Sequence, residues 1–206
     1  MKTRNPLSPF RAILVASSAL SISVGILAAE TVVSDDFSGS QLSGKWNVAK
    51  GSWTLSEGKL KGVELDADKH AAVATYAAPH TDSKVTFTSQ LAGSTGFHLS
   101  FNHAKGHLFR VIVTEKEVSV RTDKDKKDPA SVSEVIGKTG LLTRQGETHT
   151  LTCETSGDRI SLLIDGKEVV SGRHSALTSP KTGYRLVVQG TGVLFDDFSA
   201  RLPDPK

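Results

Sequence analysis

Apolar and polar residues alternate along most of the chain after residue 30. In residues 97–102, Phe, Leu and Phe alternate with His, Ser and Asn. This period of two places one set of side chains on a core and the other on solvent, as in a half-buried strand. Residues 109–113 alternate in the same way. The short link at residues 103–106 therefore predicts a hairpin between the two runs.

Further alternating runs follow at intervals of about 8 to 12 residues, which is the spacing of sandwiches and barrels. Asp165-Gly166 separates two such runs and predicts a hairpin with a type I′ turn, because that turn needs positive φ at both positions. Residues 129–142 lack the alternation, and Gly137 and Gly140 favour a mostly irregular crossover there. The sequence predicts an all-β fold, a two-sheet antiparallel jelly-roll sandwich, with a single domain at residues 30–202.

Two similar phrases bracket this domain. Val33-Ser34-Asp35-Asp36-Phe37 opens it and Leu194-Phe195-Asp196-Asp197-Phe198 closes it. First and last strands that lie side by side leave neither as a bare edge, so we predict that these two segments are adjacent. Residues 203–206 are predicted to be a flexible tail.

The first 29 residues have the pattern of a signal peptide. Lys2, Arg4 and Arg11 precede an apolar run at residues 12–27, which is shorter than the about 20 residues needed to span a bilayer. The alternative is an uncleaved anchor. We expect export to the periplasm or the extracellular space, with no membrane span after the signal is removed.

Removing this leader changes the charge. The chain has 25 Lys and Arg against 22 Asp and Glu, and the three basic residues of the leader account for the excess. A neutral domain gives no support to nucleic-acid binding, which needs a basic face. Cys153 is the only cysteine, so no internal disulfide forms, and its place in an alternating run predicts a buried thiol. We expect a monomer.

The charged clusters give no catalytic signature. Residues 121–129 resemble a calcium loop but lack its glycine and contain three lysines, so we interpret them as a solvated loop. Adjacent end strands would bring Asp36 near Asp196. A structural calcium ion there is one prediction, and carboxylates that cap turn amides are the alternative. The histidines are too scattered for zinc, and no other cofactor is expected.

Catalytic motifs are not recognisable either. The sequence has no Gly-x-Ser-x-Gly elbow, phosphate loop or dinucleotide fingerprint. Glu115 and Glu117 have the spacing of paired acids but fall in a predicted hairpin turn, so a two-carboxylate glycosidase is disfavoured. Catalytic residues are unknown. Trp46 and Trp53 fit core anchors better than platforms for stacking sugars.

A polar face remains as the candidate binding surface. If the predicted strands are neighbours, hydrogen-bonding side chains gather on one outward sheet face. Sugars bind on such surfaces through fixed amide and guanidinium groups. The alternative is the ordinary wet face of an antiparallel sheet. The predicted ligand-binding residues are Gln90, His98, Asn102, Arg110 and Arg121.

Several short motifs resemble a known group. They are Asp35-Asp36-Phe37-Ser38-Gly39, Gly51-x-Trp53, Gly106-His107-x-x-Arg110-Val111, Gly157-Asp158-x-Ile160 and the closing Phe195-Asp196-Asp197-Phe198. In these residues the chain resembles concanavalin A-like jelly-roll domains of the group that includes 3-keto-disaccharide hydrolase domains. The resemblance implies an exported bacterial protein linked to glycan use.

The hydrolase branch of that group usually has an Asn-Ser-Gly strand and a Glu-x-Gln strand in its concave site. The corresponding stretches here are residues 94–97 and 109–112, which read Ser-Thr-Gly-Phe and Phe-Arg-Val-Ile. No catalytic residue is therefore carried over. Three functions stay open: a non-catalytic domain that binds carbohydrate or a cell-surface glycan, a hydrolase or lyase acting on 3-keto-disaccharides or related glycosides, and an envelope scaffolding module.

Overall fold

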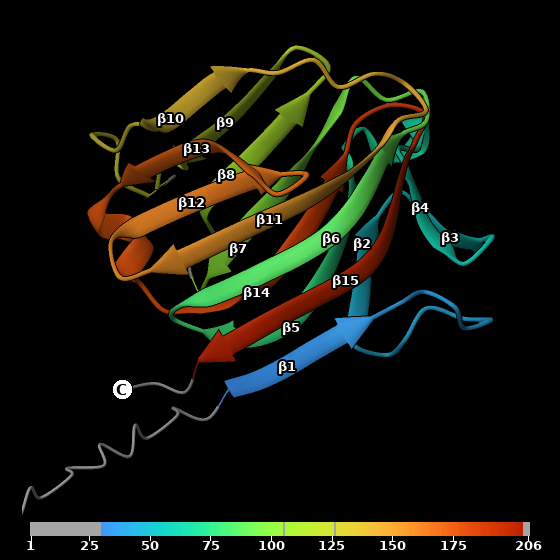
Figure 1. The fold of residues 1–206 in the computed structure, drawn as a ribbon, viewed down its shortest axis with the longest axis horizontal. Coiled ribbons are helices and arrows are strands. Elements are labelled where there is room, and N and C mark those ends of the chain that lie inside the picture. Colours follow the sequence, from blue (N-terminus) through green and yellow to red (C-terminus); the bar gives the residue numbers. More distant parts are fainter. Residues whose placement is uncertain (1–29, 105, 126, 204–206) are drawn as a thin grey trace, which may run out of the picture.

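The computed structural model describes residues 30–104, 106–125 and 127–203, which form two stacked antiparallel sheets (Figure 1). Sheet A contains β1 (Glu30–Asp35), β3 (Ser52–Ser56), β4 (Lys59–Val63), β6 (Ser83–Leu91), β11 (Thr148–Ser156), β12 (Arg159–Ile164), β13 (Lys167–Arg173) and β15 (Val193–Pro203). Sheet B contains β2 (Trp46–Lys50), β5 (Ala72–His80), β7 (Gly96–His103), β8 (Gly106–Thr114), β9 (Glu117–Thr122), β10 (Val135–Gly140) and β14 (Lys181–Val188). Two short 3-10 turns, η1 (Asp66–Asp68) and η2 (Ser175–Thr178), complete the described elements. The predicted all-β sandwich is confirmed.

The strand order brings distant parts of the sequence together. Sheet A has the order β13-β12-β11-β6-β15-β4-β3, and sheet B has the order β10-β9-β8-β7-β14-β5-β2. β1 pairs with β15, and Asp35 lies opposite Phe198. The predicted adjacency of the first and last strands is confirmed, and Figure 1 shows the two side by side. β15 includes Pro203, which the sequence assigned to the tail. The predicted leader and residues 204–206 lie outside the described residues.

The alternating residues fill the space between the sheets. Leu99 and Phe101 of sheet B and Phe87 of sheet A are fully buried. Trp46 is 6% exposed, and its ring centroid lies 5.8 Å from that of Phe37 and 5.2 Å from that of Phe198. Aromatic side chains bury large areas, so this cluster fastens the two terminal segments of the domain to the core. The interpretation of Trp46 as a core anchor is confirmed.

Cys153 also faces the core. Its side chain is fully buried, and burial raises the pKa of its thiol because the thiolate is disfavoured away from water. The predicted buried thiol is confirmed. Trp53, on the edge strand β3, is partly buried and stacks on Phe195 with 6.2 Å between ring centroids. Both tryptophans therefore contact core aromatics.

One turn was predicted correctly and one strand was missed. Asp165 has φ 51° and Gly166 has φ 77°, as the predicted type I′ turn requires. Residues 135–140, expected to be mostly irregular, instead form β10 and pair with β9. Gly137 fits there because a Cβ at this position would lie 2.8 Å from a methyl carbon of Val170. The glycine that argued against a strand permits close packing of β13 over β10.

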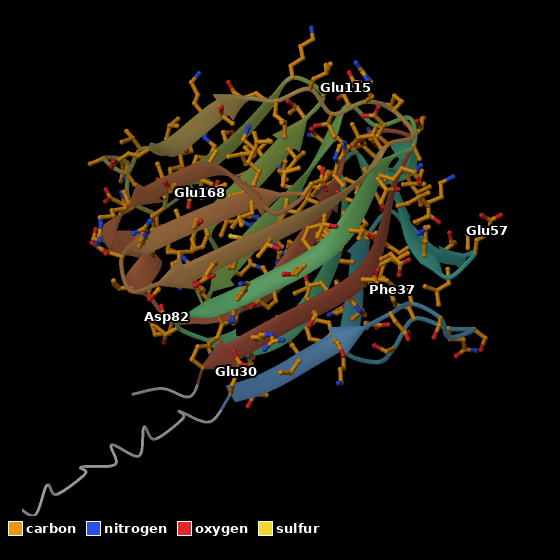
Figure 2. The ribbon with its side chains drawn as sticks, viewed as in Figure 1. Glu30, Phe37, Glu57, Asp82, Glu115 and Glu168 are labelled. Carbon is orange, nitrogen blue, oxygen red and sulfur yellow. The ribbon has the colours of Figure 1, made fainter. Side chains whose placement is uncertain are left out.

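Charged side chains cover the outside of the sandwich (Figure 2). Glu57 lies at the tip of the β3–β4 hairpin, and Glu115 lies in the turn between β8 and β9, as predicted. Within residues 30–104, 106–125 and 127–203, no helix is long and apolar enough to cross a membrane.

Candidate ligand-binding face

The outer face of sheet B carries a row of polar side chains across neighbouring strands. Leu99 and Phe101 point into the core, so the residue between them, Ser100, points outward. The strand register places Arg185 of β14 and Arg110 of β8 on either side of Ser100. Arg121 of β9 lies opposite Arg110. We call Arg185, Ser100, Arg110 and Arg121 the arginine row.

A pocket of about 410 Å³ hollows this face beside the arginine row. It is bordered on one side by the segment that links β4 to β5. Its polar lining comes from Glu64, Lys69, His70, His98, Ser100, His107, Arg110, Arg185 and Gln189. Arg110 and His98 are two of the predicted ligand-binding residues. No described residue of the β9–β10 loop lines this pocket, although Asp123, Lys124 and Asp125 of that loop line a neighbouring hollow beside Arg110.

Arg110 is held by one carboxylate. Its Nε donates to Asp123 Oδ2 at 3.0 Å, and its Nη2 donates to Asp123 Oδ1. Such a paired contact fixes the plane of the guanidinium. Burial lowers the pKa of Arg110, and the nearby Arg121 lowers it further. The interpretation of residues 121–129 as a solvated loop is wrong for Asp123, because the backbone after β9 turns its carboxylate toward the sheet.

Arg185 was missed in the sequence and lies at the centre of this face. Its Nε donates to Thr75 Oγ1 at 3.3 Å, and its Nη1 lies 3.3 Å from His107 Nε2. A guanidinium only donates, so His107 Nε2 accepts in this contact. The alternation of Tyr184, Leu186 and Val188 could have marked Arg185 as outward. Its place beside Ser100 depends on strand pairing, which the sequence does not reveal.

His98 lines the pocket as a neutral imidazole. Burial lowers its pKa to about 4, with additional lowering from Arg110 and His107. Its register partners, Val187 and Ile112, are apolar, which explains the loss of solvation. At neutral pH the ring therefore offers one donor and one acceptor. The positive charge of the pocket comes from Arg and Lys side chains.

The other predicted residues of this sheet are less accessible. Asn102 is 5% exposed, and its side-chain oxygen is buried with no hydrogen-bond partner among the described residues. Arg121 is partly buried, and its Nε likewise lacks such a partner within that part of the chain. Both residues lie on the predicted face. Their part in ligand binding stays a prediction.

Gln90 does not join this face, which corrects its predicted placement. It belongs to β6, which pairs with β11 and β15 in sheet A. Residues 92–95 cross from sheet A to sheet B, so the alternation continues on a different sheet after the crossing. Gln90 Nε2 donates to the carbonyl of Gly146 at 2.5 Å. Its role is local to that loop.

The aspartates near the domain ends contact turns and a lysine. Asp36 Oδ1 accepts from the amide and the hydroxyl of Ser38, and the amide contact lowers the pKa of Asp36. Asp196 pairs with Lys59 at 3.1 Å. The contacts of Asp36 match the alternative of turn caps, whereas Asp196 pairs with a lysine. In the part of the chain that is described, no three His, Cys, Asp or Glu side chains group to hold a metal. Calcium near Asp36 and Asp196 stays a prediction.

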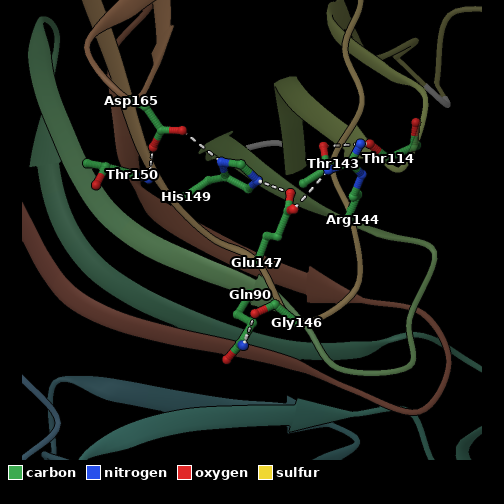
Figure 3. A network of polar contacts seen from close by, with 9 residues as sticks. All are labelled: Gln90, Thr114, Thr143, Arg144, Gly146, Glu147, His149, Thr150 and Asp165. Carbon is green, nitrogen blue, oxygen red and sulfur yellow. Dashed lines mark hydrogen bonds and ion pairs between the residues drawn. The ribbon is translucent and has the colours of Figure 1, made fainter.

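A second polar network lies at the start of β11 (Figure 3). His149 Nδ1 lies 2.7 Å from Asp165 Oδ2, and its Nε2 lies 3.7 Å from Glu147 Oε2. Asp165 Oδ1 also accepts from the Thr150 amide at 2.8 Å. Burial alone would raise the pKa of Asp165, but its hydrogen bonds with His149 and Thr150 lower it. The network holds the β12–β13 turn against β11, and we assign it a structural role.

Comparisons with known proteins identify the fold. No protein-family model matches the sequence, and no curated protein matches it. A carbohydrate-binding module, CBM66 of Bacillus subtilis, superposes with a TM-score of 0.62 at 15% identity, covering 75% of this chain and 94% of that one. Porphyranase B of Zobellia galactanivorans superposes with a TM-score of 0.64 at 12% identity, covering 84% and 93%. The carbohydrate recognition domain of Emp46p gives a TM-score of 0.60 at 10% identity, covering 77% and 88%.

These likenesses define the class of fold. The chain is a concanavalin A-like jelly-roll sandwich, as the sequence motifs indicated. Identities between 10% and 15% carry no assignment of activity. The function must therefore be argued from the outer face of sheet B.

Proposed function

We propose that this protein binds carbohydrate through the outer face of sheet B and does not itself catalyse a reaction. The observation that carries the proposal is the pocket beside the arginine row, where Arg110 and Arg185 are both held in place by neighbouring side chains. Preorganised donors lose little conformational freedom on binding. Sugar hydroxyl groups are suitable acceptors for such donors.

The neighbouring groups add to the binding capacity of this face. The neutral ring of His98 supplies a donor and an acceptor, and Glu64 and Gln189 supply further polar atoms at the pocket edge. Val187 lines the same pocket and offers apolar contact. A ligand site with a few fixed polar groups among apolar atoms is the usual arrangement in proteins. The carbohydrate-binding module CBM66, the carbohydrate recognition domain of Emp46p and porphyranase B, which share this fold, support the same conclusion.

The proposal includes export of the domain to the periplasm or the extracellular space. It is supported by the leader pattern at residues 1–29, where basic residues precede a short apolar run. A glycan ligand fits an exported domain, because cell-surface and environmental polymers are found in that compartment. We propose that the exported domain acts as a monomer.

Affinity electrophoresis through gels containing individual polysaccharides tests the binding proposal. We expect at least one polymer to retard the protein, and Arg110→Ala to weaken that retardation about tenfold or more, because it removes a charged donor. Arg201→Ala is the matched control. Arg201 is exposed on sheet A, where it pairs with Glu30.

Melting curves establish that each variant is folded. Should Arg110→Ala fail to fold, Arg121→Ala takes its place, because its Nε has no hydrogen-bond partner among the described residues. The proposed binding face would be contradicted if every polymer retards the folded variant as strongly as the wild type. It would also be contradicted if Arg201→Ala loses as much retardation as the variant.

A second candidate is hydrolysis or lysis of 3-keto-disaccharides or related glycosides. The neutral His98 and the carboxylate of Glu64 line one pocket, so two groups that can accept a proton are present together. Glu64 Oε2 accepts from the Gly190 amide at 2.8 Å, which fixes its position. Incubation of the purified protein with 3-keto-glucosides, with and without a divalent metal, tests this candidate. Turnover that His98→Gln abolishes would favour it over simple binding.

A further inference from the structure

The arginine row concentrates positive charge on one face of a neutral domain. Residues 30–206 contain seven arginines, and three of them, Arg110, Arg121 and Arg185, occupy this row. Adjacent strands lie about 4.8 Å apart, so the four positions of the row span about 14 Å across the sheet. This length exceeds a single sugar ring. It suits a polymer that carries several like charges.

Within the described residues, one of the three arginines in the row is neutralised by a carboxylate. Asp123 pairs with Arg110. Among the described residues, neither Arg121 nor Arg185 forms an ion pair with a carboxylate. Glu64 is the only carboxylate of that part of the chain that lines the pocket, and it is engaged by the Gly190 amide. Partly buried cations without counterions cost free energy unless a ligand supplies the opposite charge.

Arginines elsewhere on the surface behave differently. Arg144, Arg173 and Arg201 are exposed, and each pairs with a carboxylate, at distances of 3.3, 2.6 and 3.4 Å. The fourth arginine outside the row, Arg159 of β12, forms no ion pair within the described residues, but its side chain is exposed to water. Arg121 and Arg185 differ because they are partly buried as well as unpaired.

The positions of the guanidinium atoms favour an anion. Thr75 and His107 hold Arg185 through Nε and Nη1, which leaves Nη2 for a ligand. Asp123 holds Arg110 through Nε and Nη2, which leaves Nη1. Ser100 lies between the two arginines in the register. Guanidinium groups fixed in this way recognise planar or tetrahedral oxyanions better than they recognise hydroxyl groups.

We propose that the ligand of this face is an acidic glycan, whose carboxylate or sulfate groups lie on the arginine row. This inference rests on the proposed carbohydrate-binding function and narrows its ligand class. Arg185 is the specificity-determining residue, because it has no carboxylate partner among the described residues and it lines the pocket. Lys69, exposed at the pocket edge, adds a second charge for a longer chain.

The test measures retention on two acidic polymers and their neutral counterparts. Polygalacturonate compared with galactan examines carboxylate groups, and dextran sulfate compared with dextran examines sulfate groups. We expect at least one acidic polymer to bind more tightly than its neutral counterpart. Its binding should weaken with added salt, because exposed charges are screened. Preference for polygalacturonate assigns the carboxylate, and preference for dextran sulfate assigns the sulfate.

Variants of Arg185 separate a specific site from general attraction. Arg185→Gln should weaken binding of the acidic polymer about tenfold to a hundredfold, since it removes a charge-assisted contact. Arg173→Gln removes the same charge from an exposed position on sheet A and should leave binding nearly unchanged. Arg185→Lys keeps the charge without the planar fork, so we expect an intermediate loss. Melting curves show whether each variant is folded.

Three results would overturn the inference. Equal losses in Arg185→Gln and Arg173→Gln would show that attraction is non-specific. Retention of single-stranded DNA with the same dependence on Arg185 would show a general polyanion surface. If neutral polymers bind as tightly as acidic ones, the ligand is not specifically an acidic glycan, but the carbohydrate-binding function still holds. If no polymer is retained, that function fails together with the inference.

Discussion

The outer faces of the two sheets are both polar, but they differ in whether their central charged side chains have an oppositely charged partner. On sheet A, Lys84 pairs with Glu154 at 3.6 Å, and Thr86 and Thr152 share a hydrogen bond of 3.1 Å. On sheet B, Arg110 has one carboxylate and Arg185 has none among the described residues. An antiparallel sheet with one solvated face normally pairs opposite charges across strands. Lys84 and Glu154 of sheet A follow this rule, and Lys138 and Glu117 follow it at the edge of sheet B. Arg110, Arg121 and Arg185 in the middle of sheet B depart from it, which supports the proposed ligand face.

Burial separates the two faces as well. Lys84 and Glu154 have side chains that are 51% and 50% exposed, so their ion pair contributes little to stability. Asp123, in contrast, has a side chain only 12% exposed. Ser100, between Arg110 and Arg185, is 1% exposed although it points away from the core. Ser100 therefore lies at the floor of the pocket, below the larger side chains of its neighbours on sheet B.

The largest predicted effect on stability is that of acidification. It acts on sheet B through His98, whose pKa is lowered by burial. Its folded-state pKa of about 4 is below the ordinary value near 6.5, so the unfolded chain binds the proton first as the pH falls. Stability is therefore full above pH 6.5 and is lost as the pH falls toward 4. Allowing for partial exposure, we expect His98 to contribute about 1 to 3 kcal/mol of this loss. Arg110 and His107 disfavour its protonation.

Urea unfolding at several pH values, comparing the wild type with His98→Gln, measures this contribution. The variant should show a shallower loss between pH 6.5 and 4. It should not remove the loss completely, because burial also lowers the pKa of His80 to about 4. Identical pH profiles for the two proteins would show that His98 is not buried as described.

The carboxylates of the two faces offer a sharper comparison. Asp123→Asn should lower stability by about 1 to 3 kcal/mol, because it leaves the guanidinium of Arg110 partly buried without a charged acceptor. The same change should strengthen binding of the acidic glycan severalfold, because it removes the only carboxylate among the described residues that pairs with the arginine row. Chemical unfolding and affinity electrophoresis measure the two effects.

Glu154→Gln is the matched change on sheet A. It breaks an exposed pair, so its effect on stability should stay below about 1 kcal/mol and retention should not change. We expect Asp123→Asn to lower stability and to strengthen binding. We expect Glu154→Gln to have neither effect. Weaker binding by Asp123→Asn would mean that the positioning of Arg110 by Asp123 matters more for the ligand than the charge of the row.

These contrasts explain what the sequence could predict. Alternation fixes which residues point outward, so the orientation of His98 and Arg110 followed from their neighbours in β7 and β8. It does not fix which sheet a strand joins, and Gln90 was assigned to the wrong face for that reason. Arg185 was overlooked because β14 inserts between β7 and β5, far away in the sequence. Pairing between distant strands carries no local signature.

The ion pair of Asp123 and the strand β10 show the same difficulty. Asp123 stands in a run of alternating lysines and aspartates that reads as solvated, and only its tertiary position brings it to Arg110. Gly137 is typical of a break in a strand, yet it pairs with Val120 and leaves space for the side chain of Val170. Both features depend on neighbours supplied by the fold.

The smallest predicted effect concerns sheet A alone. Thr152→Val removes the hydroxyl that contacts Thr86 Oγ1 and replaces it with a residue that also favours strands. We expect the free energy of unfolding to change by less than about 0.5 kcal/mol, as for other substitutions on a solvated face. Retention on any polymer that the wild type binds should be unchanged, as affinity gels would show. Thr152 lies on the face of sheet A where Lys84 and Glu154 are paired. Weaker retention would therefore mean that polar side chains alone, without partly buried unpaired arginines, are enough to bind the polymer, and the proposed difference between the two sheets would be wrong.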